Sequence, residues 1–375
     1  MNTLRHGSRA RLAAVGVAAS GALLLAGCGA ANETAPPAGG GGDAAASGVS
    51  GTIAGAGASS QQAAMQAWIA GFTAVAPDAT VNYDPSGSGA GRDQFIANAV
   101  AFAGSDAALD EEELPQAQER CGGPDNVIQM PTYISPIAVV YNLEGVDNLQ
   151  LSAATMAKIF NRQITTWNDP AIAADNPGAT LPATPITPVN RSDESGTTEN
   201  FTEYLAAAAG ADWPHEPSGD WPVQGGEAAQ GTSGVISAVQ GGQGTIGYAD
   251  ASQAGELGTV AVGVGGEFVE PTPEAAAAVV ENSPRVEGQG QYNFAVELRR
   301  DTAESGNYPI VLVSYEIACT QYPDEPQAGL VQAFLGYVIS EEGQQAAAEA
   351  AGSAPITDAQ RSQYQPAIDA IAAGS

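Results

Sequence analysis

The sequence is poor in basic residues, and this deficit limits its possible partners. Its 375 residues include 12 lysines and arginines against 42 aspartates and glutamates, and Lys158 is the only lysine. Proteins that bind nucleic acids need basic faces to neutralise the phosphate backbone. A formal net charge of −30 therefore argues against a nucleic-acid partner. We interpret the acidity as a source of solubility.

Histidine, cysteine and long apolar runs are scarce as well. The chain has two histidines and three cysteines, and no cluster of His, Asp and Cys has metal-ligand spacing. The sequence thus predicts no metal site and no cofactor. Beyond the first 27 residues no stretch is apolar enough to span a bilayer.

The N-terminus has the pattern of a lipoprotein signal. Three arginines precede an apolar run over 12–27, which is short for a membrane span and ends in the sequence LAGC. In such signals the cysteine is acylated and becomes the mature N-terminus. We therefore predict a signal peptide over 1–27 and lipidation of Cys28. A plain secretory signal with an incidental cysteine is the alternative.

The segment that follows is expected to be a tether. Residues 28–49 are almost all Ala, Gly, Ser, Pro and Asn, which cannot bury a core. The remaining 325 or so residues are ample for two lobes. Removal of the signal takes away three arginines and no acidic residue, so the formal charge moves from −30 to about −33.

Two cysteines, Cys121 and Cys319, remain in the mature chain. In an oxidising compartment an even pair indicates one disulfide, which could contribute about 2–4 kcal/mol by closing so long a loop. Two buried free thiols are the alternative.

Short β-like runs alternate with helical stretches along the body, which favours α/β lobes. Two extended or polar segments, 131–136 and 288–308, are the expected crossings between lobes. The expected strands cover 81–83, 127–130, 134–142, 245–248 and 309–317, and the expected helices cover 61–75, 91–100, 109–119, 152–160, 231–240, 327–339 and 344–350.

The segment from Asn190 to Thr197 is the most informative part of the chain. It places Arg191, two hydroxyls and Gly196 just before a predicted helix. A helix start has unpaired N–H groups and a partial positive charge, so donors that converge there can bind a small oxyanion. The alternative is an Arg191–Asp193 pair beside a capped helix.

Three other segments have the same design of strand end, small-residue turn and helix: GAGASS at 55–60, PSGSGAG at 85–91 and FAGSD at 102–106. Glycines let the backbone approach a ligand, and successive N–H groups form a concave anion nest. Each segment alone has an ordinary explanation. The first could end the tether, Ser88 could cap a helix, and Asp106 could cap the helix over 109–119.

With these motifs the chain resembles the phosphate-binding lipoproteins of the bacterial phosphate ABC transporter, the PstS-like family. The resemblance extends from about Gly51 to the C-terminus. Its strongest stretches are GAGAS, VNYDPSGSGAG, FAGSDAAL, IFNRQITTWNDPAIAADNPG, NRSDESGT and GTIGYAD. It implies a two-lobe α/β protein of the periplasmic-binding-protein-like (type II) fold, with the ligand cleft between the lobes. We expect one lobe to hold 50–130 and 308–375 and the other 134–307.

The resemblance also implies roles for individual residues. Asp106 would accept a hydrogen bond from the protonated phosphate oxygen, and Arg191 would be the charged donor, held by Asp193. The other implied donors are the hydroxyl and N–H of Ser59, the N–H of Ser60, the hydroxyl and N–H of Ser88, and the hydroxyl and N–H groups of Ser195, Gly196 and Thr197.

The chain departs from the family at Ser60-Gln61-Gln62, where an aromatic residue and a proline are common. Ser86 offers a hydroxyl without an assigned role. The segment 159–178 has no ligand role that we can assign, and we expect it to be a structural turn of the second lobe.

Phosphate and sulfate differ in a way that such a site can detect. Near neutral pH phosphate keeps at least one proton and sulfate keeps none, so a fixed carboxylate among donors favours phosphate. We predict an extracytoplasmic, lipid-anchored binding protein at the cell membrane that is not an enzyme. It would capture inorganic phosphate and deliver it to the permease and ATPase subunits of an ABC transporter.

Three alternatives stay open. The first is a secreted phosphatase or serine hydrolase that uses Ser88 or Ser195, with His215 as a lone general base. The second is a receptor for another tetrahedral oxyanion. The third is a lipoprotein whose main role is adhesion or signalling.

Overall fold

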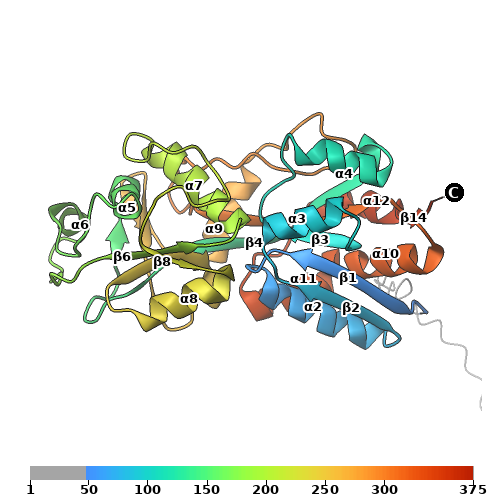
Figure 1. The fold of residues 1–375 in the computed structure, drawn as a ribbon, viewed down its shortest axis with the longest axis horizontal. Coiled ribbons are helices and arrows are strands. Elements are labelled where there is room, and N and C mark those ends of the chain that lie inside the picture. Colours follow the sequence, from blue (N-terminus) through green and yellow to red (C-terminus); the bar gives the residue numbers. More distant parts are fainter. Residues whose placement is uncertain (1–47, 375) are drawn as a thin grey trace, which may run out of the picture. The chain divides into compact units, whose positions relative to one another are not determined.

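A computed structural model of the protein describes residues 48–374 (Figure 1). The predicted signal peptide, Cys28 and nearly all of the predicted tether lie outside the described residues. Within the part of the chain that is described, no helix is both long and apolar enough to cross a membrane.

One mixed sheet runs through the described chain. Its strands follow the order β2-β1-β3-β12-β4-β8-β6-β7, and the short β9 pairs with β4. In sequence order the strands are β1 (Gly51–Gly57), β2 (Ala79–Asp84), β3 (Phe102–Ser105), β4 (Val127–Asn142), β6 (Thr187–Arg191), β7 (Glu227–Ala229), β8 (Thr245–Asp250), β9 (Gly258–Thr259) and β12 (Val311–Cys319).

Strand β4 connects the two ends of this sheet. Its residues 127–136 pair with β12, and its residues 137–142 pair with β8. We call β2, β1, β3 and β12 with their helices the first lobe, and β8, β6 and β7 with their helices the second lobe. The predicted residue boundaries of the lobes stay a prediction, because the sheet continues from one lobe into the other.

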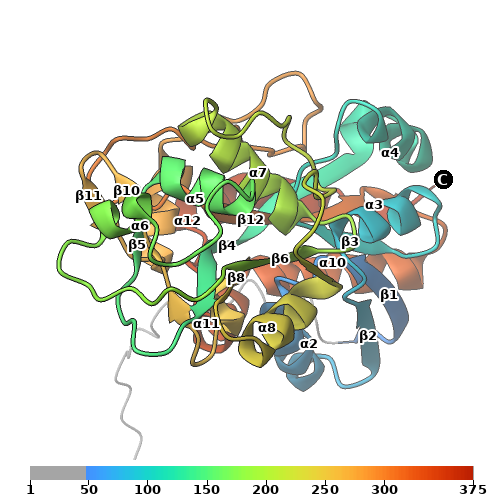
Figure 2. The same cartoon turned by 60° about the vertical axis from the view of Figure 1, so that its left-hand side comes forward.

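Helices cover both faces of each lobe (Figures 1 and 2). In the first lobe α3 packs on β1 and β3, and α2 packs on α11 and α10. In the second lobe α8 packs on β8, β6 and β4, and α7 packs on β8 and α5. These helices are α2 (Gln62–Val75), α3 (Ser88–Ile96), α5 (Ala153–Phe160), α7 (Gly196–Ala209), α8 (Gly231–Gly241), α10 (Glu325–Ile339) and α11 (Glu341–Ala351).

The remaining elements are short or peripheral. They are the helices α4 (Glu113–Cys121), α6 (Pro170–Asp175), α9 (Pro273–Glu281) and α12 (Asp358–Asp369), the 3₁₀ turns η1 (Pro124–Asn126) and η2 (Ala251–Gln253), and the strands β5 (Gln150–Leu151), β10 (Ala261–Val264), β11 (Glu267–Val269), β13 (Gln321–Tyr322) and β14 (Ala372–Ala373).

The central strands are buried on both sides, which explains their sequences. Every residue of β12 is buried, and so is every residue of β4 except the last. Strands covered by helices on both faces read as continuous apolar runs instead of alternating ones. Trp68, Phe72, Phe102 and Phe334 fill the first lobe, and Phe160, Phe201 and Tyr248 belong to an aromatic cluster in the second.

The prediction of two strands, 127–130 and 134–142, was wrong, because β4 is one strand of 16 residues. Pro131 and Pro136 suggested an interruption, since proline cannot donate to a ladder. Pro131 lies at a register shift in the β12 pairing between Ser314 and Tyr315, which lie opposite Tyr133 and Pro131. Pro136 is the last residue of β4 that pairs with β12, and the pairing with β8 begins at Ile137.

Several helix boundaries also differ from prediction. Helix α3 begins at Ser88 and ends at Ile96, instead of covering 91–100, and α4 lies at Glu113–Cys121 instead of 109–119. Helices α6, α9 and α12 were not predicted. The interior Pro366 of α12 disfavours helix in a sequence reading.

The two cysteines form a disulfide in the structure, as predicted. Cys121 is the last residue of α4 and Cys319 the last of β12, and 198 positions separate them in the sequence. The bond joins α4, the helix after β3, to β12, the strand of the first lobe that pairs with β4.

Candidate anion-binding site

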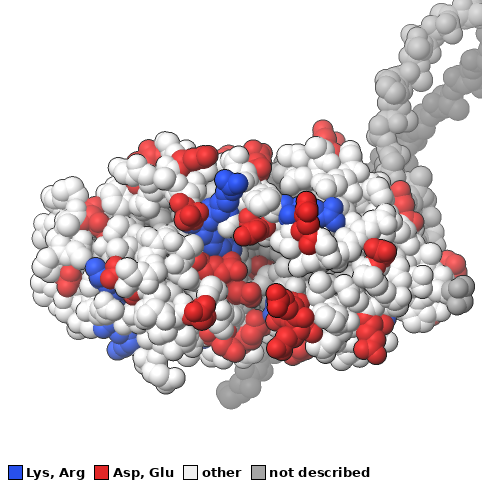
Figure 3. All heavy atoms as spheres, turned by 90° about the horizontal axis from the view of Figure 1, so that it is seen from above, with Lys and Arg blue, Asp and Glu red and all other residues white. Residues whose placement is uncertain are grey.

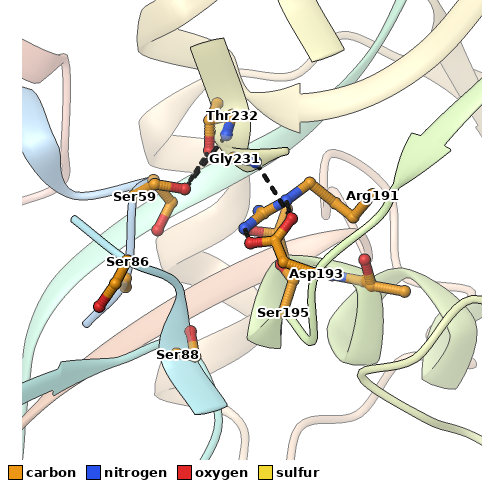
Figure 4. A network of polar contacts seen from close by, with 12 residues as sticks. Ser59, Ser86, Ser88, Arg191, Asp193, Ser195, Gly231 and Thr232 are labelled. Atoms are coloured by element: carbon orange, nitrogen blue, oxygen red, sulfur yellow. Dashed lines mark hydrogen bonds and ion pairs between the residues drawn. The ribbon is translucent and has the colours of Figure 1, made fainter. Parts of the chain in front are cut away.

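The four predicted turns come together where the lobes meet. Strands β1, β2 and β3 are parallel, so the turns at their carboxyl ends lie at one edge of the sheet. Strand β6 of the second lobe ends at Arg191, just before α7. Figure 4 shows Ser59, Ser88, Arg191 and Ser195 around one common space. All four residues are buried.

The three serines are prepared to act as hydrogen-bond donors. A backbone N–H donates to each hydroxyl oxygen: Thr232 to Ser59 at 3.1 Å, Asp106 to Ser88 at 3.2 Å, and Thr198 to Ser195 at 3.4 Å. A hydroxyl whose oxygen already accepts a hydrogen bond keeps its own proton free to donate. Ser88 and Ser195 therefore offer O–H groups to an anion, and Ser59 does so when the Thr232 hydroxyl, 3.1 Å away, is the donor in their contact.

Ser88 and Ser195 differ in their local roles. Ser195 is the N-cap of α7, so Gly196 and Thr197 form the first turn of that helix. The N-cap of α3 is Gly87, and Ser88 is the first helical residue. The alternative of Ser88 as a simple helix cap is therefore wrong.

Arg191 supplies a fixed positive charge. It is only 3% exposed, and its Nε and Nη2 contact the two carboxylate oxygens of Asp193 at 2.9 and 2.5 Å. Burial by itself raises the pKa of Asp193, but the hydrogen bonds and charge of Arg191 outweigh it, and the net pKa lies below its usual value. The pair is ionic, and Asp193 holds the guanidinium as predicted from the resemblance.

Asp106 accepts hydrogen bonds from three hydroxyls. Ser60 Oγ lies 2.7 Å from both carboxylate oxygens, Thr197 Oγ1 lies 2.9 Å from Oδ2, and Ser314 Oγ lies 2.5 Å from Oδ1. Burial raises the pKa of Asp106 above its ordinary value, although these hydroxyls oppose the shift. Asp106 does not cap α4, because Asp110 accepts from the first N–H groups of that helix.

These contacts reduce the expected contribution of Thr197 and leave that of Ser60 as its N–H alone. Both direct their hydroxyls to Asp106, so what they can offer an anion is the backbone N–H. Ser314 was missed by sequence reasoning. The available signal was a pair of polar residues, Ser314 and Glu316, inside the largely apolar run VLVSYEIAC of β12.

The start of α7 packs directly on the Asp106 loop. A Cβ added to Gly196 would lie 2.7 Å from Asp106 Cβ and 2.8 Å from the N atom of Ala107, so only glycine fits at this position. Asn200 Nδ2 donates to the carbonyl oxygen of Asp106 at 2.7 Å. The lobes are therefore in contact at the site.

Helix α8 adds two residues that the sequence reading missed. The N–H of Gly231 donates to Asp193 Oδ1 at 3.0 Å, and the hydroxyls of Thr232 and Ser59 are 3.1 Å apart (Figure 4). The signal was present, because Gly231-Thr232 repeats the pattern of a glycine and a hydroxyl at a helix start.

Comparison with known proteins identifies the family of the chain. A family model described as a PBP superfamily domain matches residues 42–342. The chain is 37% identical over 372 residues to the phosphate-binding protein PstS 3 of Mycobacterium leprae (strain TN), and 38% identical over 373 residues to PstS 3 of Mycobacterium tuberculosis (strain ATCC 25618 / H37Rv). Each match covers 96% of this chain and 98% of the relative. The chain belongs to the PstS family.

Solved structures support the fold. A high-affinity periplasmic phosphate-binding protein, solved with bound phosphate, is 24% identical, with a TM-score of 0.68 over 84% of this chain and 93% of that one. A human phosphate-binding apolipoprotein gives 23% identity and the same TM-score and coverage. The two-lobe, periplasmic-binding-protein-like α/β fold is thus confirmed.

Within this PstS-family chain, a charged rim lies beside the buried site. Arg92 of α3 contacts Glu113 at 2.8 Å, Ser105 at 2.9 Å and, from the other lobe, Glu194 at 3.2 Å. Arg92, Glu113 and Glu194 line a hollow of about 590 Å³, and Glu199 lines it as well. Figure 3 shows acidic side chains gathered near the middle of the molecule. Burial raises the pKa of Glu199 to about 7, and the charge of Arg92 opposes this shift.

The features of the hydrolase alternative are not brought together. His215 contacts Asn161 Oδ1 through Nε2 at 3.1 Å and packs against Trp213. The hydroxyl oxygens of Ser88 and Ser195 accept hydrogen bonds from backbone N–H groups and not from this histidine. Among residues 48–374, no group of three or more His, Cys, Asp or Glu side chains could hold a metal ion.

Two other predictions concern residues outside the site. In the segment 159–178, Trp167 is buried and donates from Nε1 to the carbonyl of Gly244 at 3.0 Å, which supports the structural role expected for it. Ser86 makes only local contacts, since it accepts a hydrogen bond from Gln94 at 3.2 Å and lies 3.5 Å from the carbonyl of Asp84.

Proposed function

We propose that the protein captures inorganic phosphate outside the cytoplasm and delivers it to the permease of an ABC transporter. The observation that carries this proposal is the set of three serine hydroxyls, each with a backbone N–H at its oxygen, around the Arg191–Asp193 pair. Relatives named as phosphate-binding proteins match 96% of the chain, and they are binding proteins rather than enzymes.

The geometry supports a specific set of proposed ligand contacts. Ser59, Ser88 and Ser195 donate their hydroxyls, Arg191 donates from its guanidinium, and Ser60, Gly196 and Thr197 donate backbone N–H groups. Asp106 accepts a hydrogen bond from the protonated phosphate oxygen. A carboxylate has about four acceptor sites, so three hydroxyls leave one for that proton. Sulfate brings no proton, and its oxygen would then face the carboxylate without a bond.

Calorimetric titration of the purified protein with phosphate and then with sulfate tests this function. We expect tight 1:1 binding of phosphate and at least about 100-fold weaker binding of sulfate. Arg191→Ala should weaken binding of both anions, whereas Arg299→Ala, which removes an exposed charge, should not. Equal affinity for the two anions would favour a general oxyanion receptor. Turnover of a chromogenic phosphate ester would favour a hydrolase.

We further propose that the mature chain is anchored through acylated Cys28 on the extracytoplasmic face of the membrane. The support is the LAGC sequence after the apolar run of the signal. A single acyl chain holds a protein only marginally, so the anchor should carry more than one. Cys28→Ala should move the protein out of the membrane fraction. A variant that stays wholly in that fraction would refute the anchor.

A further inference from the structure

Gln253 reaches from the second lobe to the first at the predicted phosphate turn. It ends η2, the 3₁₀ turn that follows β8. Its Nε2 donates to the carbonyl oxygen of Ser59 at 3.0 Å and to that of Ser60 at 3.1 Å. Both carbonyls belong to the turn between β1 and α2. The side chain therefore binds both peptide groups of this turn from the opposite lobe.

These two bonds set the direction of the turn's N–H groups. In a trans peptide the C=O and the N–H of the following residue point in opposite directions. When Gln253 holds the Ser59 carbonyl, the N–H of Ser60 must point away from the second-lobe amide. The Ser60 carbonyl fixes the N–H of Gln61 in the same way. The orientation of a proposed phosphate donor thus depends on Gln253.

The position of Gln253 is itself fixed. Asp250 is fully buried and is the N-cap of η2, because its Oδ1 accepts from the N–H of Ser252 at 2.9 Å. The hydroxyl of Tyr133 on β4 donates to the same carboxylate at 3.0–3.1 Å. A short, capped turn anchored to the central strand gives the amide little freedom to follow the first lobe if the lobes separate.

We propose that Gln253 is a positioning residue that holds the Ser59–Ser60 turn in its donor orientation when the lobes are closed, and so slows the release of phosphate. This proposal rests on the proposed function. Binding proteins of this fold close around their ligands by hinge motion, and a bond made only in the closed state contributes to affinity chiefly through the dissociation rate. In the open state water can replace both partners of each bond.

The test is stopped-flow measurement of phosphate association and dissociation for the unchanged protein, Gln253→Ala and Gln253→Glu. We expect dissociation to quicken about tenfold in the alanine variant. The glutamate variant should release phosphate faster still, since its carboxylate would face two carbonyl oxygens. Gln253→Lys, which restores a donor of similar reach, should recover part of the slow release. Gln240→Glu, at an exposed position of α8, is the control for the added charge.

Thermal unfolding separates positioning from general stabilisation. Without phosphate, Gln253→Ala should melt at the temperature of the unchanged protein, and with saturating phosphate its melting temperature should rise less. Two results would overturn the proposal. One is an unchanged phosphate dissociation rate in Gln253→Ala and Gln253→Glu, and the other is a melting temperature of Gln253→Ala that is lowered equally with and without phosphate. If the unchanged protein binds no phosphate, the proposed function fails and this proposal fails with it.

Discussion

At the scale of single residues, the site depends on which partner each hydroxyl already has. The hydroxyls of Ser59, Ser88 and Ser195 accept hydrogen bonds from backbone N–H groups, whereas those of Ser60 and Thr197 donate to Asp106. Sequence motifs predicted the residue types and their convergence. They did not give the whole division of roles, because several partners lie far away along the chain: Asp106 is 91 positions from Thr197, and Thr232 is 173 positions from Ser59.

Asp106→Asn should reduce discrimination between phosphate and sulfate more than it reduces affinity for phosphate. The carboxylate gains a charge-assisted bond from the phosphate proton, of about 1.5–3 kcal/mol, and it repels a fully deprotonated anion. An Asn can turn its N–H groups toward sulfate, which removes that repulsion. The measurement is a pair of titrations, with the exposed Asp110→Asn as control. An unchanged ratio of the two affinities would show that Asp106 is not the selectivity element.

Glu199 should make the stability of the protein depend on pH. Burial raises its pKa from 4.5 to about 7, so the folded state holds this proton more tightly than the unfolded state does. Stability from this group is therefore greatest at low pH and declines as pH rises from about 4.5 to about 7.

Glu199→Gln should remove this part of the pH dependence. In urea unfolding, we expect the free energy of unfolding of the variant to change by about 1–2 kcal/mol less between pH 5 and pH 8 than that of the unchanged protein. At pH 8 the variant should be the more stable of the two. Glu111→Gln, an exposed control, should keep the original slope. A slope that is the same in all three proteins would mean that Glu199 titrates as it does in the unfolded chain.

At the scale of elements, the strand–turn–helix units could be predicted, and the way they interlock could not. GAGASS, FAGSD and NRSDESGT each contain the end of a strand, and PSGSGAG directly follows one, as expected. The continuous β4 was misread because its prolines resemble a break, whereas long-range pairing with β12 and β8 keeps it extended. Arg92 and Gln253, which reach the other lobe, lie outside any motif that a local pattern would mark.

The Cys121–Cys319 disulfide should stabilise the first lobe. It links α4 to β12 and closes a loop of about 200 residues, so its loss should lower the free energy of unfolding by about 2–4 kcal/mol. Urea unfolding with and without reductant measures this effect. The double variant Cys121→Ala/Cys319→Ala should have the stability of the reduced protein, and added reductant should not change it. Free, alkylatable thiols in the native protein would refute the bond in solution.

At the scale of the whole molecule, an anion must approach a strongly acidic protein. The processed chain carries about 33 more negative than positive charges, and acidic side chains gather near the junction of the lobes. The attraction that holds phosphate is therefore local, from oriented O–H and N–H groups and Arg191, while the long-range field opposes its arrival.

Added salt should therefore speed the association of phosphate. Repulsion between the ligand and the protein is screened beyond about 10 Å at 0.1 M ionic strength. We expect the association rate to rise several-fold between about 0.01 and 0.2 M salt, with the dissociation rate changing less. Sodium chloride and potassium chloride should act alike if ionic strength is the cause. Association that slows with added salt would reveal a positive local field at the site entrance.

The most direct test of the site is a crystal structure of the protein grown with phosphate. We predict one phosphate ion with oxygens within hydrogen-bond distance of the hydroxyls of Ser59, Ser88 and Ser195 and of the Arg191 guanidinium, and one oxygen beside Asp106. Phosphate bound elsewhere with these groups unoccupied, or bound here with the serine hydroxyls turned away, would contradict the proposed site.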